Sequence, residues 1–235
     1  MGKVIFKNSK TIFVILLVVY AFMAVVATSM GAANITPYKV LNAILEKVPF
    51  VGQYIDGSVP KTDSLIIFMV RMPRIIMASL VGIGLSVVGA SFQSLFKNPM
   101  ADPYVLGISS GAALGAALAI VLKIPNPAAS ISIITISAFA CAIFTTLLVY
   151  YIAQVRGKVT TINLLLAGCA ISFLMTSIIS IIMVFNQQEV NKIVFWMMGS
   201  FNASSWSNIC VVAPIVLIGT IVIYFFYRDF NLMLT

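Results

Sequence analysis

The chain has 235 residues, of which 61% are hydrophobic and only 9% are charged, and its mean hydropathy is +1.11. A soluble domain of this length cannot bury that much apolar surface, so the composition excludes the soluble classes and indicates an integral membrane protein. The net charge of +8 comes from 14 Lys and Arg against 6 Asp and Glu, with no His.

Long stretches without Lys, Arg, Asp or Glu divide the chain into candidate spans. A bilayer core of about 30 Å requires roughly 20 helical residues. The sequence therefore predicts an all-α, polytopic transmembrane bundle of about six spans in a single domain over residues 1–235. The predicted spans are residues 11–30, 74–96, 104–122, 130–153, 161–185 and 209–227.

The first span follows Lys3, Lys7 and Lys10. A basic flank before an apolar run also describes a secretory signal peptide, but this run is long for that role and more spans follow. An uncleaved signal anchor is the preferred interpretation. A cytoplasmic N-terminus then places Lys97 and Arg156 on the same side. Basic residues divide evenly between the two sides, so the orientation depends on the N-terminal lysines and the compact loop around Arg156.

Residues 31–70 form the one long polar connection, which we predict to be an outer loop with a short surface helix. Its charged residues and helix breakers are Lys39, Glu46, Lys47, Asp56, Lys61 and Asp63, with Pro37, Pro49 and Pro60. A later apolar segment, Val194 to Phe201, is too short to cross. We interpret it as an interfacial or re-entrant helix anchored by Trp196.

Several kinds of chemistry are missing from the sequence. No Asp or Glu falls inside a predicted span, which weakens the case for an ion-coupled carrier, although backbone carbonyls can also bind sodium. Gly157 and Lys158 lack the earlier glycine of a phosphate loop, so we expect no ATP hydrolysis by that route in this chain. Cys141, Cys169 and Cys210 lie within spans, and their spacing supplies neither a disulfide framework nor the ligands of a zinc site. We interpret them as small apolar side chains that fill space between helices. We expect no cofactor and no metal site.

Small residues recur every four positions on two neighbouring spans. They are Ala78, Gly82, Ser86 and Ala90 on the second span, and Gly107, Gly111 and Gly115 on the third. Small residues allow helix backbones to approach closely in lipid, where the hydrophobic effect gives no gain. We therefore expect the second and third spans to pack face to face through Gly82, Ser86, Gly107 and Gly111.

The fifth span carries a similar stripe, formed by Gly168, Ser172, Thr176 and Ser180. Three of these side chains bear hydroxyls, which either bond to the carbonyl four residues back or line a polar path. Helix packing and a transport-path or dimer face both remain open for this stripe.

The connection between the second and third spans predicts a tight cytoplasmic turn. Asn98 and Pro99 end one helix, while Asp102 caps the next with Pro103 in its first turn.

A wider set of motifs surrounds this turn. In order they are Arg71-Met72-Pro73-Arg74, residues 82–93, Asn98-Pro99-Met100-Ala101-Asp102-Pro103, Leu106-Gly107-Ile108-Ser109-Ser110-Gly111-Ala112, Leu166-Ala167-Gly168, Phe195-Trp196-Met197-Met198-Gly199-Ser200 and Trp206. Their order and spacing resemble the permease family of iron-siderophore, haem and cobalamin ABC importers. The resemblance covers almost the whole chain from Arg71 onward.

The resemblance implies a ten-span permease that works as a dimer with cytoplasmic ATPase subunits and an extracytoplasmic substrate-binding protein, in the cytoplasmic (inner) membrane. It implies a siderophore, haem or cobalamin as cargo, without naming one. This sequence ends after about six spans, before the family's coupling segment and last four helices. We expect a fragment, a truncated product or half of a split permease, with ATPase coupling uncertain for the chain alone.

The same resemblance makes Arg71 and Arg74 outer-surface contacts for acidic residues of the binding protein. Arginine suits this role because its guanidinium pairs with carboxylates in a bidentate geometry. The alternative is interfacial snorkelling near lipid headgroups.

Two other function classes remain open. A secondary carrier or channel for a small solute fits the hydrophobicity and the small-residue packing. A structural membrane subunit without transport fits the lack of charge within the spans.

Overall fold

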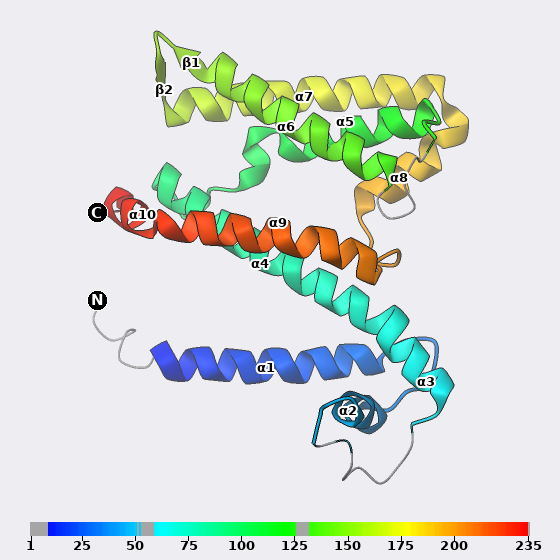
Figure 1. Cartoon of the computed structure of the whole chain (residues 1–235). Helices are drawn as coiled ribbons and strands as arrows, with labels where there is room; N and C mark the ends of the chain where they lie inside the picture. The colour runs from blue at the N-terminus through cyan, green and yellow to red at the C-terminus, as the bar shows by residue number, and fades with distance from the viewer. Residues whose placement is uncertain (1–8, 51, 53–58, 126–131, 235) are drawn as a thin grey trace. The chain divides into compact units, whose positions relative to one another are not determined.

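The computed structural model describes residues 9–50, 52, 59–125 and 132–234. These residues are almost entirely helical (Figure 1). The all-α membrane fold predicted from the sequence is therefore confirmed. Contacts along the chain divide it into two compact units, Met1–Ser79 with Asn202–Ile209, and Leu80–Phe201 with Cys210–Thr235.

The first unit holds the N-terminal helix and most of the long polar connection. Its elements are α1 (Ser9–Ser29), α2 (Pro37–Glu46), α3 (Lys61–Leu65), the π-helix η3 (Ile66–Arg71) and the start of α4 (Met72–Phe96). Helix α2 confirms the predicted surface helix and begins at Pro37, whose fixed φ suits the first helical position. Val40 and Ala43 of α2 pack with Ile35 and Ile67 into a small buried core.

The second span begins earlier than predicted. Lys61–Phe96 is one continuous helical stretch of 36 residues that includes α3, η3 and α4. The predictions of a loop to residue 70 and of a span from residue 74 were wrong at this boundary. The absence of charge was the criterion for a span, so the predicted span began at Arg74. In the structure the same helical stretch already includes Arg71 and begins at Lys61.

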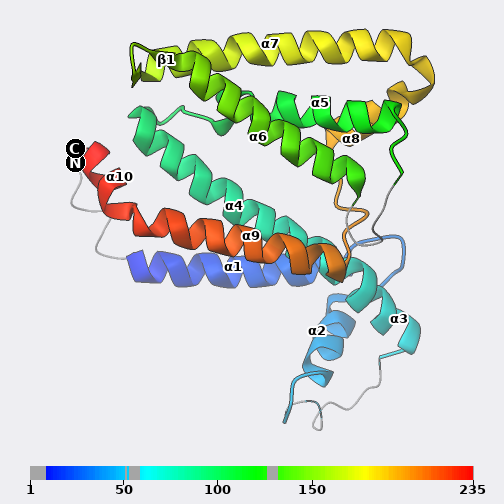
Figure 2. The ribbon, with the colours of Figure 1, turned by 45° about the horizontal axis from the view of Figure 1, so that its top comes forward.

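The second unit is built around three helices. Its elements are η4 (Pro103–Leu106), α5 (Ile108–Val121), α6 (Ile133–Ala153), β1 (Gln154–Val155), β2 (Lys158–Val159), α7 (Thr161–Phe185), η5 (Gln187–Glu189), α8 (Val190–Met198), most of α9 (Trp206–Phe225) and α10 (Tyr227–Leu234). Helices α5, α6 and α7 lie side by side (Figures 1 and 2), and α8 packs on α5. Their shared core contains Leu114, Ala117, Val149, Ile171 and Ile193.

A short β-hairpin with a two-residue turn joins α6 to α7. Strands β1 and β2 pair antiparallel, with Val155 opposite Lys158. Arg156 and Gly157 between them have φ values of 52° and 75°. Two successive left-handed residues form the turn that matches the natural twist of a short hairpin.

Within the described part of the chain, five helical stretches are long and apolar enough to cross a membrane: Lys10–Ser29, Lys61–Phe96, Ile133–Ala153, Thr161–Phe185 and Trp206–Phe225. The predicted span 104–122 is different, because the chain breaks at Gly107, where φ is 72°. Helix α5 has 14 residues, or about 21 Å, and is shorter than a bilayer core. The predicted short helix near Trp196 is confirmed as α8, whose 9 residues begin four positions earlier.

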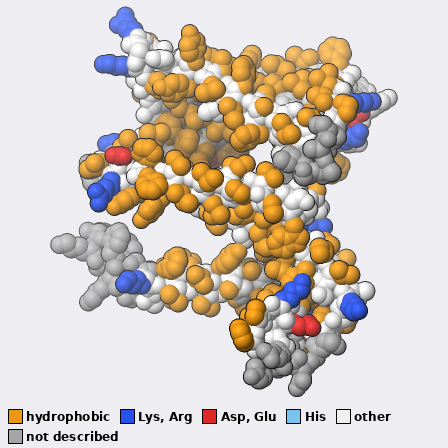
Figure 3. All heavy atoms as spheres, in the orientation of Figure 1, with side chains coloured by type: hydrophobic (Ala, Val, Ile, Leu, Met, Phe, Trp, Pro, Cys, Tyr) orange, Lys and Arg blue, Asp and Glu red, His pale blue; other side chains and the backbone are white. Residues whose placement is uncertain are grey.

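Large apolar side chains cover the outside of the long helices, and basic side chains gather near helix ends (Figure 3). In the α1 span only 6% of the most apolar window is buried. Surfaces of this kind require lipid or further helices around them. Together the long apolar helices and these surfaces identify an integral membrane protein.

Candidate functional site

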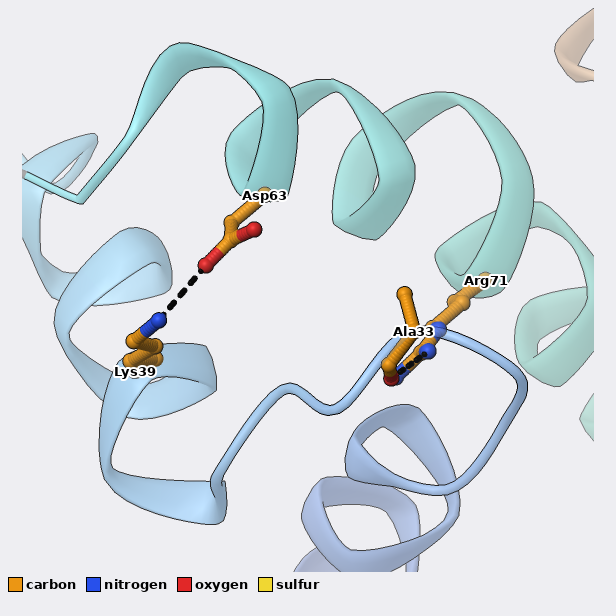
Figure 4. Close-up of polar contacts among 4 residues, drawn as sticks. All are labelled: Ala33, Lys39, Asp63 and Arg71. Atoms are coloured by element: carbon orange, nitrogen blue, oxygen red, sulfur yellow. Dashed lines mark hydrogen bonds and ion pairs between the residues drawn. The ribbon is translucent and has the colours of Figure 1, made fainter.

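Arg71 is the last residue of η3, and its side chain reaches the loop that joins α1 to α2. Its Nη1 donates to the carbonyl oxygens of Thr28 at 2.8 Å and Ser29 at 2.7 Å. Its Nη2 donates to the carbonyl oxygen of Ala33 at 2.6 Å, the bond drawn in Figure 4. The last carbonyls of a helix lack intrahelical partners and carry the negative end of the helix dipole. A guanidinium is well suited to them because it is always charged and has five donors.

The surroundings of Arg71 leave no room for another partner. The side chain is only 8% exposed, and a Cβ added to Gly31 would lie 2.9 Å from Nη2. Both predicted roles for Arg71, docking and lipid snorkelling, required an accessible guanidinium. The structure instead uses Arg71 to hold the end of α1 and the following loop against the start of the second span.

Two further contacts fix the connection after α1 to the same continuous helix. Lys39 Nζ of α2 forms an ion pair with Asp63 Oδ2 of α3 at 2.8 Å (Figure 4). Lys47 Nζ lies 3.7 Å from the centroid of the Phe68 ring, in cation–π geometry. With the Arg71 contacts, they join residues 30–50, 52 and 59–71, the described part of this connection, into a folded cap rather than a loose loop.

Arg74 is held less tightly than Arg71. Its Nη2 donates to the carbonyl oxygen of Asn202 at 3.2 Å, in an exposed position. Its Nε is buried without a hydrogen-bond partner in the described part of the chain. Nearby, Trp206 Nε1 donates to the carbonyl oxygen of Phe68 at 2.9 Å. Of the two predicted docking residues, Arg74 is the more exposed, being only half-buried.

The stripe on α4 does not pack as predicted. Ala78, Gly82, Ser86 and Ala90 are all exposed. A Cβ added to Gly82 would meet nothing within 4 Å, and the Ser86 hydroxyl donates to the Gly82 carbonyl at 2.7 Å. The prediction that Gly82 and Ser86 pack against the glycines of the third span is wrong within this chain. A period of four marks a face that permits close approach, but it does not specify the partner helix.

The glycines of the third span instead face α6 and α7. A Cβ on Gly111 would collide with Thr145, and one on Gly115 with the Ser137 carbonyl and Cys141, all on α6. A Cβ on Gly107 would lie 3.1 Å from the Ser172 hydroxyl of α7. The glycines therefore serve close helix packing, as predicted, but with different neighbours.

The stripe on α7 changes character along the helix. Gly168 is buried, and a Cβ there would collide with the backbone of Val105, whereas Ser172 is half-buried and Thr176 and Ser180 are exposed. Each hydroxyl donates to the carbonyl four residues earlier, at 2.8 Å for Ser172 and Thr176 and 3.0 Å for Ser180. The start of the stripe is a packing surface, and its far end is open.

The turn after α4 has the local geometry expected from its sequence. Asn98 Oδ1 accepts from Met100 N, and Asp102 Oδ1 accepts from Tyr104 N, both at 2.9 Å. Pro99 follows the end of α4, and Pro103 begins η4. Asp102 thus caps a 3₁₀ turn, and α5 starts only after Gly107.

Sequence reasoning missed a charged cluster near the end of α7. Glu189 is buried beside Lys123 and Lys192. A signal was available, because Glu189 is the only acidic residue between Pro103 and Arg228. The three free cysteines do not cluster with it, and the described residues contain no group of three or more His, Cys, Asp or Glu.

Comparison with known proteins gives consistent results. The chain is 36% identical over 176 residues to a cobalamin import system permease of Halobacterium salinarum, covering 75% of this chain and 47% of that protein. It is 30% identical over 207 residues to an Fe(3+)-citrate import system permease of Bacillus subtilis, covering 88% and 57%. The chain thus spans about half the length of these relatives.

The fold also matches a solved structure, described as an inward-facing conformation of a metal-chelate type ABC transporter. The TM-score is 0.76 at 24% identity, over 95% of this chain and 64% of that one. At this identity the match supports the fold alone. The family model of the FecCD transport family matches residues 15–235. This protein is therefore a member of the FecCD transport family.

Proposed function

We propose that this chain forms part of the membrane-spanning permease of an ATP-binding-cassette importer, which moves an iron chelate, haem or cobalamin across the cytoplasmic membrane. The observation that carries the proposal is the family match over residues 15–235, together with apolar helices long enough to cross a bilayer. The relatives named for cobalamin and Fe(3+)-citrate import support this cargo range.

The proposal includes the partners that such a permease needs. They are a second permease copy, cytoplasmic ATPase subunits that hydrolyse ATP, and an extracytoplasmic substrate-binding protein. We place the N-terminus in the cytoplasm, which puts the folded cap outside. We treat residues 1–235 as one permease domain.

The α7 stripe is proposed to line the transport path near the dimer axis. Thr176 and Ser180 are exposed, yet their hydroxyl protons are committed to their own helix. Such a surface is mildly polar but offers no fixed ligand geometry. This suits a path for a bulky chelate, because transport requires binding weak enough for release.

We propose that the binding protein docks on Arg74, while Arg71 holds the surrounding surface in place. Arg74 lies one helical turn after Arg71, and its Nη2 is exposed at the hydrogen bond to the Asn202 carbonyl oxygen. By tying the cap to the helix, Arg71 fixes the surface around Arg74. A preorganised arginine loses less freedom when it pairs with a carboxylate.

Vesicle uptake distinguishes this proposal from the two other classes. A secondary carrier or channel moves its solute without nucleotide, and a structural subunit moves none. The complete permease, reconstituted with its ATPase and binding protein, should accumulate ferric citrate or cobalamin only with ATP. Nucleotide-independent uptake would favour the carrier, and absence of uptake in a correctly assembled complex would favour the structural role.

A further inference from the structure

A polar cavity lies where α5 and α7 end, within the second unit. Its volume is about 580 Å³, and it is lined by Val121, Lys123, Val184, Phe185, Asn186, Gln187, Gln188 and Glu189. Sites for small molecules commonly have volumes of about 300–1,000 Å³ and a few convergent polar groups. With the N-terminus in the cytoplasm, this cavity opens at the outer end of the helices.

The one carboxylate in the cavity wall is already paired. Glu189 Oε2 lies 2.8 Å from Lys192 Nζ, and the Glu189 side chain is only 11% exposed. Lys192 is three residues further along and outside the cavity lining. The contact is ionic rather than a well-formed hydrogen bond, because no described donor meets Glu189 Oε2 in hydrogen-bond geometry. The negative charge of Glu189 is therefore partly neutralised from outside the cavity.

Lys123, by contrast, keeps its charge available. Its Nζ is 3.8 Å from Glu189 Oε1, beyond hydrogen-bond distance, and its side chain is 75% exposed. An ammonium group has three donors. Glu189 is closer to Lys192, at 2.8 Å, than to Lys123, at 3.8 Å. Lys123 is therefore the cation in the cavity wall that is able to meet an incoming anion.

The backbone fixes the point from which Lys123 projects. Its φ is 48°, a left-handed conformation that is uncommon for residues other than glycine. Lys123 N bonds to the Ile120 carbonyl at 3.3 Å, and Ile124 N bonds to the Ala119 carbonyl at 3.4 Å. These two bonds form the Schellman pattern that closes a helix. Gln187 and Gln188 add exposed side-chain amides on the facing segment.

We propose that this cavity receives the carboxylate groups of an anionic metal chelate, with Lys123 as the pairing cation. The proposal rests on the proposed function and deepens it by naming the chemical class of cargo, a carboxylate-bearing chelate rather than an uncharged one. Glu189 Oε1, 3.8 Å from Lys123 Nζ, attracts Lys123 weakly and repels an incoming carboxylate. Removing Glu189 should therefore strengthen binding, whereas a purely structural role for Glu189 predicts the reverse.

The test measures binding by equilibrium dialysis, using the 235-residue chain in nanodiscs of uncharged lipid at low ionic strength. The probes are iron-55 ferric citrate and cyanocobalamin, which has no net charge. Lys123→Gln should weaken ferric citrate binding by about threefold to tenfold, and Lys123→Arg should restore it. Glu189→Gln should tighten it by about threefold. Lys158→Gln, on the β1–β2 turn, is the control and should change nothing.

Cyanocobalamin binding should be the same in all variants. The inference is overturned if wild-type chain of normal helical content does not bind ferric citrate, if Lys123→Gln binds it like wild type, or if Glu189→Gln weakens it. Equal losses for both probes would also overturn the assignment to an anionic chelate. No nucleotide or partner is present in this assay, so failure of ATP-driven uptake, which would sink the proposed function, is a separate result.

Discussion

Arg71 Nη2 donates to the carbonyl oxygen of Ala33 at 2.6 Å, joining two residues that lie 38 positions apart in the chain. Arg71→Ala removes this bond and those to Thr28 and Ser29, leaving one buried and two partly buried carbonyls without their donor. We expect a loss of about 2–4 kcal/mol in the stability of the cap. Hydrogen exchange of the amides in residues 33–47 should accelerate. Arg156→Ala, at an exposed turn, is the control, and unchanged exchange in Arg71→Ala would show that the bonds do not hold the cap.

Arg74 is predicted to contact the binding protein while Arg71 stays in place. Arg74→Gln should weaken partner affinity by up to about fivefold, because exposed pairs contribute about 0–1 kcal/mol. Arg74→Glu should weaken it further through repulsion and reduce its dependence on salt. Surface plasmon resonance on the complete transporter provides the measurement. Lys61→Glu, which reverses another exposed charge of the same unit, is the control. An equal loss of affinity in Lys61→Glu would show that Arg74 acts only through the net charge of this surface and makes no specific contact.

Substitution by leucine should destabilise the protein at Gly111 but not at Gly82. Gly111→Leu forces a side chain into Thr145 and should destabilise the packing of α5 on α6 by about 3 kcal/mol or more. Gly82→Leu meets nothing within 4 Å and should be tolerated by this chain. Thermal unfolding in detergent compares the two. Equal melting temperatures would contradict the packing described for α5.

Thr176 and Met175 are neighbours on α7 with different exposure. Thr176 is exposed, whereas Met175 is only 5% exposed. In a background with Cys141, Cys169 and Cys210 replaced by Ala, Thr176→Cys in the assembled transporter should react with a water-soluble thiol reagent, and Met175→Cys should stay protected. Protection of Thr176→Cys in every nucleotide state would remove the α7 stripe from the transport path.

The stability contributed by Glu189 should depend on pH in a defined direction. The ion pair with Lys192 holds the pKa of the Glu189 carboxyl below its ordinary value of 4.5. A depressed carboxyl pKa gives stabilisation that is complete above the unfolded-state pKa and is lost as the pH falls through the folded-state value. The melting-temperature difference between wild type and Glu189→Gln should therefore be constant above about pH 6 and shrink as the solution is acidified below 4.5. A difference that instead shrinks on raising the pH would contradict the ion pair.

Much of the helical framework was predictable because charge is excluded from the bilayer core. The predicted span 161–185 coincides with α7, and 209–227 differs from α9 by two or three residues. The same rule failed at Arg71 and Arg74, since a helix can continue through an arginine whose charge is satisfied by backbone carbonyls. It also missed the break at Gly107, because an apolar composition does not reveal a left-handed residue.

The site was harder to predict than the fold. Local chemistry sufficed for Asn98 and Asp102, whose hydrogen bonds reach only two residues along the chain. Long-range partners were not predictable in the same way. Arg71 binds carbonyls about 40 positions earlier, and Gly111 packs on Thr145 rather than on Gly82. Helical spacing defines a face, but the partner of that face depends on the packing of the whole bundle.

ATP dependence of uptake tests the central claim most directly. Vesicles that contain the complete permease, its ATPase and its binding protein are loaded either with ATP or with a non-hydrolysable analogue. The account predicts accumulation of ferric citrate or cobalamin against its gradient with ATP, and no accumulation with the analogue. Equal uptake under both conditions, or uptake that follows an ion gradient without nucleotide, would contradict it.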